Sequence, residues 1–372
     1  MKSNVIGNVI NDATYGANKY AYIARYNKKK RAYDDAMIGV GYKGAPLKWK
    51  RYVILAIVIA FFVYALAVAG ISAYAGREAI RPAIKELPPI SVNLAVDYSS
   101  VNFKSIDGTT TLRGWLFKAP NSENIVIMIH GWGENRFNYG AETLDLVETF
   151  IDNDFSVLAF DLRNSGDSDQ SISTYGLFEK DDVLGAINYA LNAHFSNIVL
   201  FGFSTGANAA ILAAAKPIAD RSENPVVTQQ FLDVLSSSVD ALILDTPVTD
   251  VGDYIMRVLD EKGFDLPYFP FKYTIPFAVN LNINGDINKV DDDRALNNFV
   301  PRPVLLIHGE NDSIVKSDDI QEMYDQYMEI ATGKISIWSD PNSGHMENYY
   351  NSRRRYLEKI TIFLEMVFPG DS

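Results

Sequence analysis

The stretch Asn197-Ile-Val-Leu-Phe-Gly-Phe-Ser-Thr-Gly206 contains the pattern that decides the fold. Its apolar run, Ile198 to Phe201, predicts a buried strand, and the small residues from Ala207 to Ala215 predict a helix. Between them lies Gly-x-Ser-x-Gly, a motif that forms a sharp turn and exposes its serine when a strand precedes it and a helix follows. The two glycines suit a turn with no room for a Cβ atom. The stretch therefore makes Ser204 a candidate nucleophile.

A serine hydroxyl is a weak nucleophile, so it needs a general base, and the base needs a carboxylate that orients it. Downstream of Ser204, the buried-strand pattern of residues 304–307 leads into two carboxylates, Glu310 and Asp312. A second strand pattern, residues 334–338, is followed by Gly344 and His345. The chain thus offers a serine, an acid and a histidine in that order, with two residues competing for the role of the acid.

The region from about Tyr98 onward resembles an α/β-hydrolase of the serine-esterase or aminopeptidase-like branch. Five motifs in the matching order carry this resemblance: His130-Gly-Trp-Gly133, Asp161-Leu-Arg-Asn-Ser-Gly-Asp-Ser168, Gly202-Phe-Ser-Thr-Gly206, His308-Gly-Glu-Asn-Asp312 and Gly344-His345. The resemblance implies an α/β fold with a mostly parallel central sheet flanked by helices, and a cap inserted into it. The motifs are not specific for any substrate.

The resemblance also assigns roles to residues. It implies that Ser204 is the nucleophile, that His345 is the base and that Asp312, rather than the bracing Glu310, is the acid. The backbone N–H groups of Trp132 and Thr205 are expected to form the oxyanion hole. No metal ion or organic cofactor is expected.

Several other polar residues are interpreted as structural. We expect His130 to stabilise its own loop, His308 to be structural, and His194 to lie at the surface or at a helix end. The Asp161 and Arg163 side chains are more typical of loop bracing than of catalysis.

The N-terminal part of the chain contains a candidate membrane span. Residues 52–76 carry no charge, and the almost wholly apolar run from Val53 to Ala69 belongs to a segment long enough to cross the hydrocarbon core. We expect an uncleaved transmembrane helix. The alternative is a signal peptide, because Ala73-Tyr-Ala75 resembles a signal-peptidase site whose cleavage would release the body.

The charge distribution predicts the topology. Residues 1–51 hold 11 Lys and Arg against 3 Asp and no Glu, whereas the remainder holds 23 basic and 43 acidic residues. Positive charge favours the cytoplasmic side, so we expect a cytoplasmic tail and an extracellular catalytic domain on a single-pass protein of the cell membrane. The basic tail also suits contact with anionic lipid headgroups. The acidic body argues against nucleic-acid binding. The sequence has no cysteine, which excludes disulfides and thiolate nucleophiles.

The predicted organisation is a basic tail (1–51), a transmembrane helix (52–76), a linker (77–97) and a hydrolase domain (98–372). The α/β alternation lapses over about 248–302, where we expect the cap. Its aromatic residues would line a lid, form a small core of the insert, or both. They are Tyr254, Phe264, Tyr268, Phe269, Phe271, Tyr273 and Phe277. Asp286 and Asp291–Asp293 do not match a calcium loop, and helix capping is their expected use.

The sequence therefore predicts a membrane-anchored serine hydrolase that cleaves a carboxylic ester or a related acyl bond in a small-molecule or lipid-like substrate. The same residues would serve an aminopeptidase or an acyltransferase. A surface binding protein without turnover is a third hypothesis, since a fold alone never excludes it.

Overall fold

The computed structural model of the chain describes residues 18–35, 48–88, 97–215, 227–290 and 292–369. The chain divides into two compact parts, Met1–Ala67 and Val68–Ser372. Residues 18–35 form an exposed helix within the segment that we predicted as a basic tail. The segment lacks the apolar periodicity on which a helix prediction rests, and an exposed helix does not need it.

The helix that follows, α2 (Lys48–Ala79), contains the predicted span and exceeds it at both ends. Among the described residues it is the one helix long and apolar enough to cross a membrane, and none of its most apolar window is buried. After Ala79 the chain leaves the helix, with Pro82 shortly beyond its end. Such a segment fits an anchor or a signal sequence by length and composition alone.

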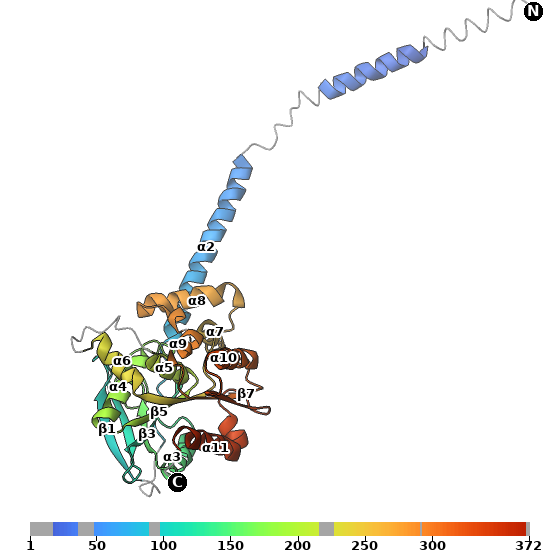
Figure 1. Cartoon of the computed structure of the whole chain (residues 1–372). Coiled ribbons are helices and arrows are strands. Elements are labelled where there is room, and N and C mark those ends of the chain that lie inside the picture. The colour runs from blue at the N-terminus through green and yellow to red at the C-terminus, as the bar shows by residue number, and fades with distance from the viewer. Residues whose placement is uncertain (1–17, 36–47, 89–96, 216–226, 291, 370–372) are drawn as a thin grey trace, which may run out of the picture. The chain divides into compact units, whose positions relative to one another are not determined.

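The second part is built on one eight-stranded sheet (Figure 1). Its strands are β1 (Tyr98–Lys104), β2 (Thr111–Phe117), β3 (Asn124–Ile129), β4 (Ser156–Asp161), β5 (Asn197–Phe203), β6 (Val239–Asp245), β7 (Val304–Gly309) and β8 (Ile335–Asp340). They lie in the order β1-β2-β4-β3-β5-β6-β7-β8. Only β2 runs against its neighbours, so the sheet is mostly parallel, as predicted, with its antiparallel pairings at one edge.

Helices cover both faces of the sheet (Figure 1). One face packs against α3 (Thr143–Asp152) and α11 (Asn348–Val367), and the other against α4 (Glu179–Asn192), α5 (Thr205–Ala214), α6 (Gln229–Ser237) and α10 (Ser317–Ile330). Successive side chains of a strand point to opposite faces. Thus Leu200 packs in one layer while Val199 and Phe201 pack in the other. This explains why the central strands appear as continuous apolar runs.

The predicted cap region holds the helices α7 (Val251–Glu261), α8 (Tyr268–Ile283), η2 (Ile287–Lys289) and α9 (Asp292–Phe299). Of its seven predicted aromatic residues, Phe264 is half-buried and the other six divide into two sets. Tyr254 and Phe271 are buried, whereas the side chains of Tyr268, Phe269, Tyr273 and Phe277 are exposed. The Asp286 side chain accepts the backbone N–H of Asn288 and thereby caps η2. The capping predicted for Asp291–Asp293 lies outside the residues whose side chains are described.

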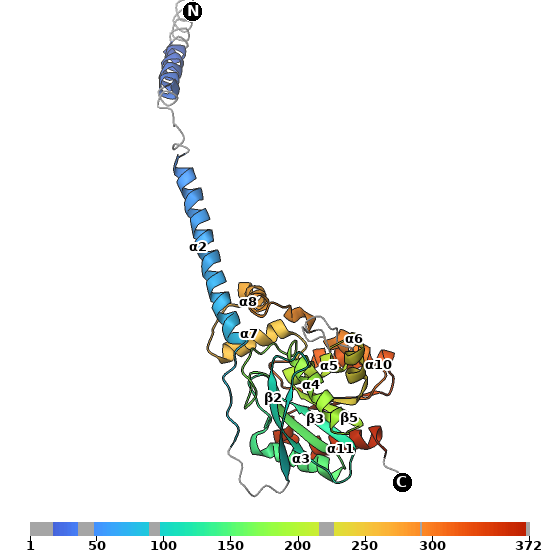
Figure 2. The same ribbon diagram turned by 90° about the vertical axis from the view of Figure 1, so that its left-hand side faces the viewer.

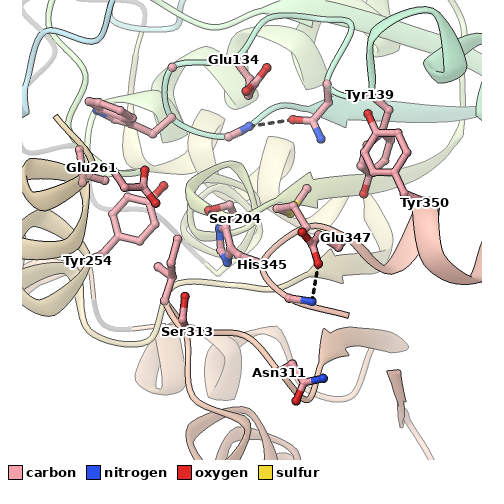
Figure 3. Close-up of a pocket in the computed structure, with 18 of the residues that line it drawn as sticks. Glu134, Tyr139, Ser204, Tyr254, Glu261, Asn311, Ser313, His345, Glu347 and Tyr350 are labelled. Atoms are coloured by element: carbon pink, nitrogen blue, oxygen red, sulfur yellow. Dashed lines mark hydrogen bonds between the residues drawn. The ribbon is translucent and has the colours of Figure 1, made fainter. Parts of the chain in front are cut away.

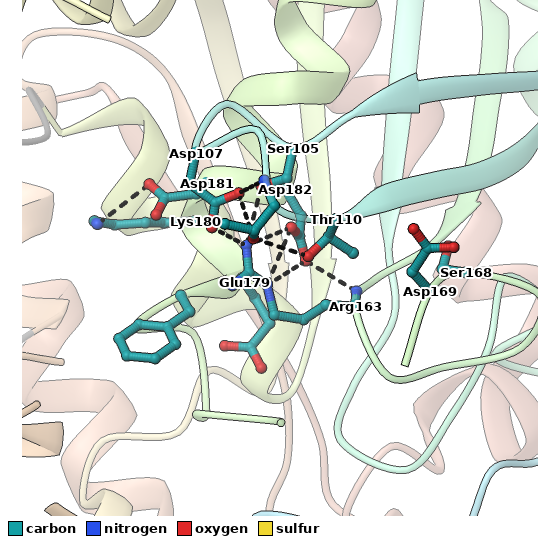
Figure 4. A network of polar contacts seen from close by, with 12 residues as sticks. Ser105, Asp107, Thr110, Arg163, Ser168, Asp169, Glu179, Lys180, Asp181 and Asp182 are labelled. Atoms are coloured by element: carbon teal, nitrogen blue, oxygen red, sulfur yellow. Dashed lines mark hydrogen bonds and ion pairs between the residues drawn. The ribbon is translucent and has the colours of Figure 1, made fainter. Parts of the chain in front are cut away.

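A buried ion pair braces the loop that follows β4 (Figure 4). The Arg163 guanidinium donates to Asp182 of α4, at 2.7 Å from Nη2 to Oδ1 and 3.0 Å from Nε to Oδ2. It also reaches Ser105 and Asp107 in the turn after β1. Although burial alone would lower the pKa of Arg163, the Asp182 carboxylate raises it above its ordinary value. The Asp161 carboxylate likewise accepts a hydrogen bond from the buried Arg136 guanidinium, at 3.1 Å from Nε to Oδ2. Both loop residues therefore act as braces.

We expect Arg163→Met to destabilise the protein strongly. Loss of the guanidinium leaves the Asp182 carboxylate, which is fully buried, without its cation. Breaking a buried pair in this way costs about 3–5 kcal/mol. The matched control is Arg113→Met, because Arg113 pairs with Asp169 at the surface and exposed pairs contribute about 0–1 kcal/mol. Urea unfolding of the detergent-solubilised protein measures both losses, and equal losses would contradict the assignment.

Candidate active site

Ser204 occupies a strained turn between β5 and α5. Its φ is +51° and its ψ is −122°, a region that residues with a Cβ rarely adopt. The flanking glycines make this possible. A Cβ added to Gly202 would lie 2.4 Å from Cα of Ala207, and one added to Gly206 would lie 2.3 Å from the carbonyl oxygen of Ile129. Only glycine fits either position, and the turn presents Ser204 at the carboxyl end of β5.

The structure brings His345 to Ser204 and Asp312 to His345. The distance from Ser204 Oγ to His345 Nε2 is 3.0 Å, and that from His345 Nδ1 to Asp312 Oδ2 is 2.8 Å. His345 lies in the loop after β8, and Asp312 lies in the loop after β7. The side chain of Asp312 is completely buried. Three residues far apart in the sequence thus form one chain of hydrogen bonds at the carboxyl edge of the sheet.

Of the two candidate acids, only Asp312 contacts the histidine. Its second oxygen, Oδ1, accepts the backbone N–H groups of Ile314 at 2.6 Å and Val315 at 2.9 Å, which fixes the carboxylate. Glu310 is exposed and its backbone N–H donates to Asp340. The geometry is therefore the one expected for Asp312 as the orienting acid.

The loop after β3 lies against Ser204 and carries Trp132. A Cβ on Gly131 would lie 3.2 Å from Cβ of Ser204, so the loop backbone approaches the serine closely. On the other side, Thr205 is the first residue of α5, where backbone N–H groups have no partner within the helix. Both residues predicted for the oxyanion hole thus flank Ser204.

His130 fixes this loop. Its Nε2 accepts the backbone N–H of Leu162 at 3.0 Å, so its Nδ1 carries the proton and donates to the carbonyl of Gly131 at 2.8 Å. Burial lowers the pKa of His130, against the opposing effect of Asp161. His308 is also buried and lies 3.0 Å from the Ser317 hydroxyl, and His194 is exposed just after α4. None of the three has a hydrogen bond to the Ser204–His345–Asp312 chain.

Asp245, at the end of β6, is a polar centre that the sequence analysis missed. Its backbone carbonyl accepts the N–H of Ser204 at 2.8 Å. Its carboxylate accepts the hydroxyls of Tyr139 at 2.9 Å and Tyr356 at 2.7 Å, and it is also bonded by Asn348. Burial raises the pKa of Asp245, while these donors lower it. One buried carboxyl thus connects the serine turn to α11 and to the segment before α3.

Ser204 and His345 open into a pocket of about 860 Å³ (Figure 3). The loop after β3 forms one wall, and α7 contributes Tyr254, Val258 and Glu261 to another. A pocket of this size suits a small organic ligand. Because α7 belongs to the insert between β6 and β7, the insert shapes the space in front of the serine.

Tyr254 is the insert residue nearest the hydrogen-bonded chain. Its ring centroid lies 6.2 Å from that of His345, and its side chain points toward Ser204 (Figure 3). Burial raises the pKa of Tyr254 to about 12, although the nearby Ser204 hydroxyl acts in the opposite direction. The phenol therefore stays protonated at neutral pH and remains a possible donor. Tyr254 was predicted only as one of seven aromatic residues of a lid or a small core, without a contact to Ser204 or His345 of its own.

Charged residues at the pocket were also missed. Glu134 directly follows the His-Gly-Trp-Gly motif, so its position beside that motif was a usable signal. No sequence signal pointed to Lys85, because residues 77–97 resemble a connector. In the structure Lys85 and Glu134 form an ion pair, and the Asn135 side chain donates to the Lys85 carbonyl at 3.0 Å. The segment after α2 is thereby attached to the loop beside Ser204. Within the described residues, no cluster of three His, Asp or Glu side chains is arranged to hold a metal ion.

Comparisons with known proteins identify the fold. The sequence model for the alpha/beta hydrolase fold matches residues 124–272. The Pyrococcus furiosus esterase Pf2001 superimposes with a TM-score of 0.58 at 20% identity, over 77% of this chain and 97% of that one. The Thermogutta terrifontis esterase Est2 gives a TM-score of 0.52 at 15% identity, over 73% and 94%. The chain therefore has the α/β-hydrolase fold.

Curated relatives are more similar in sequence. YqkD of Bacillus subtilis, an uncharacterized protein, is 23% identical over 256 residues, which cover 68% of this chain and 75% of YqkD. YfhR of Salmonella typhimurium, also uncharacterized, is 24% identical over 233 residues, covering 60% and 68%. These relatives indicate a shared fold and supply no activity.

The buried His130 predicts an acid-sensitive stability. The unfolded chain takes up a proton below the ordinary histidine pKa of 6.5, whereas the pKa of folded His130 is lower. The free energy of unfolding should therefore fall as pH drops below 6.5, by up to about 1.4 kcal/mol per pH unit for one proton. We expect His130→Gln to reduce this slope and His194→Gln, at an exposed position, to retain it. Urea titrations between pH 5 and 8 measure the slopes; identical slopes in all three proteins would disprove the role of His130.

Proposed function

We propose that the protein is a membrane-anchored serine hydrolase that cleaves a carboxylic ester through an acyl-enzyme. The observation that carries this proposal is the hydrogen-bonded chain Ser204–His345–Asp312, with its serine at the mouth of a pocket. Serine, imidazole and carboxylate in this geometry form the arrangement that activates a hydroxyl for attack on an acyl carbon.

In the proposed reaction, Ser204 Oγ attacks the ester carbonyl carbon while His345 Nε2 takes the hydroxyl proton. The C–O bond to the alcohol then breaks, and the alcohol leaves with the proton from His345. Water attacks the acyl-serine in the same way and releases the acid. Asp312 holds the Nδ1–H tautomer of His345 and stabilises its cation. The chemistry requires no metal or organic cofactor.

The negative charge that develops on the carbonyl oxygen during the attack must be stabilised by hydrogen-bond donors. The backbone N–H groups of Trp132 and Thr205 flank the serine and are our candidates for the oxyanion hole. Loss of one such donor costs about 3–4 kcal/mol in the activation free energy. The strained backbone at Ser204 and the hydrogen bonds of His130 support a fixed geometry of this kind.

Two considerations support an ester as the substrate. The structural neighbours Pf2001 and Est2 are named as esterases. An alcohol is also a better leaving group than an amine, so an ester is cleaved more readily than an amide. An aminopeptidase or an acyltransferase would use the same three residues. Turnover of aminoacyl arylamides in preference to short acyl esters would favour the aminopeptidase. A binding protein without turnover would have to leave a complete hydrogen-bonded chain unused.

An uncleaved anchor is supported by the packing at the end of α2. Ala75 and Ala79 are fully buried and Ile80 is 2% exposed, so this end of the helix belongs to the core of the body. Cleavage after Ala75 would cut a continuous helix beside these packed residues. We therefore favour a transmembrane anchor over a signal peptide that is removed.

We expect Ser204→Ala and His345→Ala to abolish labelling by a fluorophosphonate probe, which reacts only with an activated serine. Hydrolysis of p-nitrophenyl esters should fall by about 10⁴- to 10⁶-fold, because each residue acts only as part of the unit. For Asp312→Asn we expect a loss of about 10⁴-fold, since the amide favours the wrong imidazole tautomer.

Glu310→Gln is the matched control for Asp312→Asn. It makes the same chemical change two residues away in the same loop, on an exposed side chain, and should leave turnover unchanged. Circular dichroism of each variant establishes that it is folded. Parental rates in a folded Ser204→Ala protein would refute the proposed mechanism.

The proposed topology places the tail in the cytoplasm and the body outside. Protease added to intact cells should then degrade a C-terminal epitope tag and leave a tag at the N-terminus protected. The expected asymmetry follows from the 11 basic residues in the first 51. The opposite protection pattern would reverse the orientation, and release of the body into the medium would indicate cleavage.

A further inference from the structure

The helix α8 of the insert is apolar on its exposed side as well as on its buried side. Phe271, Ile275, Ala278, Val279 and Ile283 pack into the body. On the other side, Tyr273, Phe277 and Leu281 follow one another at intervals of four residues, which places them in one row along the helix. They are 66%, 63% and 68% exposed, and Phe269, at the non-helical kink that precedes them, is 75% exposed. We call these four residues the α8 row.

The α8 row lacks the polar character of an ordinary surface helix. The helix contains no Asp or Glu, and its one charged residue, Lys272, pairs with Asp253 of α7 at 2.8 Å. Contiguous apolar patches on soluble surfaces mark sites that another surface covers. The α8 row therefore calls for a partner that is itself apolar.

The position of α8 identifies this partner. Ser72 of α2 donates to the Thr274 hydroxyl of α8 at 2.8 Å, and a Cβ on Gly76 would lie 3.2 Å from Cβ of Ala278. The helix α8 runs across the C-terminal end of α2 (Figures 1 and 2). Ser72 is three residues beyond Ala69, where the apolar run of the span ends. At 1.5 Å per residue, this contact lies roughly 5 Å from the end of the run.

Neighbouring side chains have the chemistry of a membrane–water boundary. Tyr74, close to Phe264, is 60% exposed, and tyrosines are enriched where a bilayer meets water. Arg77 and Arg81 follow on the exposed surface and add positive charge beside this boundary. The body as a whole carries an excess of acidic residues, so general electrostatic attraction does not hold it on such a bilayer. The contact with lipid is therefore expected to come from insertion of the apolar α8 row, with basic side chains beside it.

We propose that the α8 row is inserted into the boundary between headgroups and acyl chains of the bilayer that α2 crosses. This inference rests on the membrane anchorage in the proposed function and adds a second contact with the lipid. It has a consequence for the active site, because α7 packs on α8 and contributes Tyr254 and Val258 to the pocket. The bilayer thus holds the insert, and with it one wall of the pocket, at the membrane surface.

The absence of cysteine allows a direct test. Full-length protein carrying Phe277→Cys or Leu281→Cys is labelled with an environment-sensitive nitrobenzoxadiazole dye. It is then reconstituted into vesicles of phosphatidylcholine and phosphatidylglycerol. The matched control is Ile362→Cys, an apolar residue of α11 that is 51% exposed. Lipids with a nitroxide near the headgroup end of the acyl chain serve as quenchers. We expect a blue-shifted emission and strong quenching at positions 277 and 281, and water-like emission without quenching at 362.

The outcomes separate this inference from the proposed function. In vesicle-bound protein, water-like and unquenched dyes at 277 and 281 would overturn the inference while leaving the anchor intact. Energy transfer between dyes on different copies, without lipid quenching, would assign the α8 row to a second copy and also overturn it. Failure of the protein to float with the vesicles would overturn both the anchor and the inference. Fluorophosphonate labelling of Ser204 in the same samples tests the chemistry independently.

Discussion

Ser204 adopts a φ of +51° at the junction of β5 and α5, and the candidate site depends on this one strained residue. The strain is maintained from both sides. Gly202 and Gly206 allow backbone contacts that a Cβ would prevent, and the Ser204 N–H is held by the Asp245 carbonyl. Strain of this kind persists only where the surroundings determine it fully. The result is a hydroxyl lifted out of the sheet, where partners from other strands can reach it.

His345 and Asp312 lie near Ser204 because parallel strands place their carboxyl ends along one edge of the sheet. The loops after β5, β7 and β8 deliver the serine, the carboxylate and the histidine, and the loop after β3 approaches from the side. Buried polar groups make these loops rigid. Asp245 is connected to Tyr139 and Tyr356, while Arg163 and Asp182 fix the loop after β4. Distances near 3 Å within the site follow from this bracing.

The C-terminal end of α2 is hydrogen-bonded to the loops around the candidate site. The carbonyl of Ala79 accepts both the Trp132 indole N–H, at 3.2 Å, and the Tyr175 hydroxyl, at 2.5 Å. Lys85 pairs with Glu134 one residue beyond the His-Gly-Trp-Gly motif. The segment that leaves the proposed membrane span is therefore fastened to the loop beside the serine. This arrangement connects anchorage with the geometry of the site, through contacts over 40 residues apart in the sequence.

Local sequence patterns predicted the strands that precede Ser204, Asp312 and His345, the turn at Ser204 and the long apolar helix, because periodicity, glycine spacing and hydrophobic length are local properties. The residues alone left Glu310 and Asp312 as candidate acids and the family resemblance favoured Asp312, but only the tertiary structure shows that Asp312 meets His345. The exposed helix at 18–35 escaped prediction, because it lacks the apolar periodicity on which a helix prediction rests. The polar centre at Asp245 and the site contacts of Lys85 and Tyr254 were likewise decided by tertiary structure. The contacts of Asp245, Lys85 and Tyr254 depend on distances between segments far apart in the chain, which no local pattern encodes.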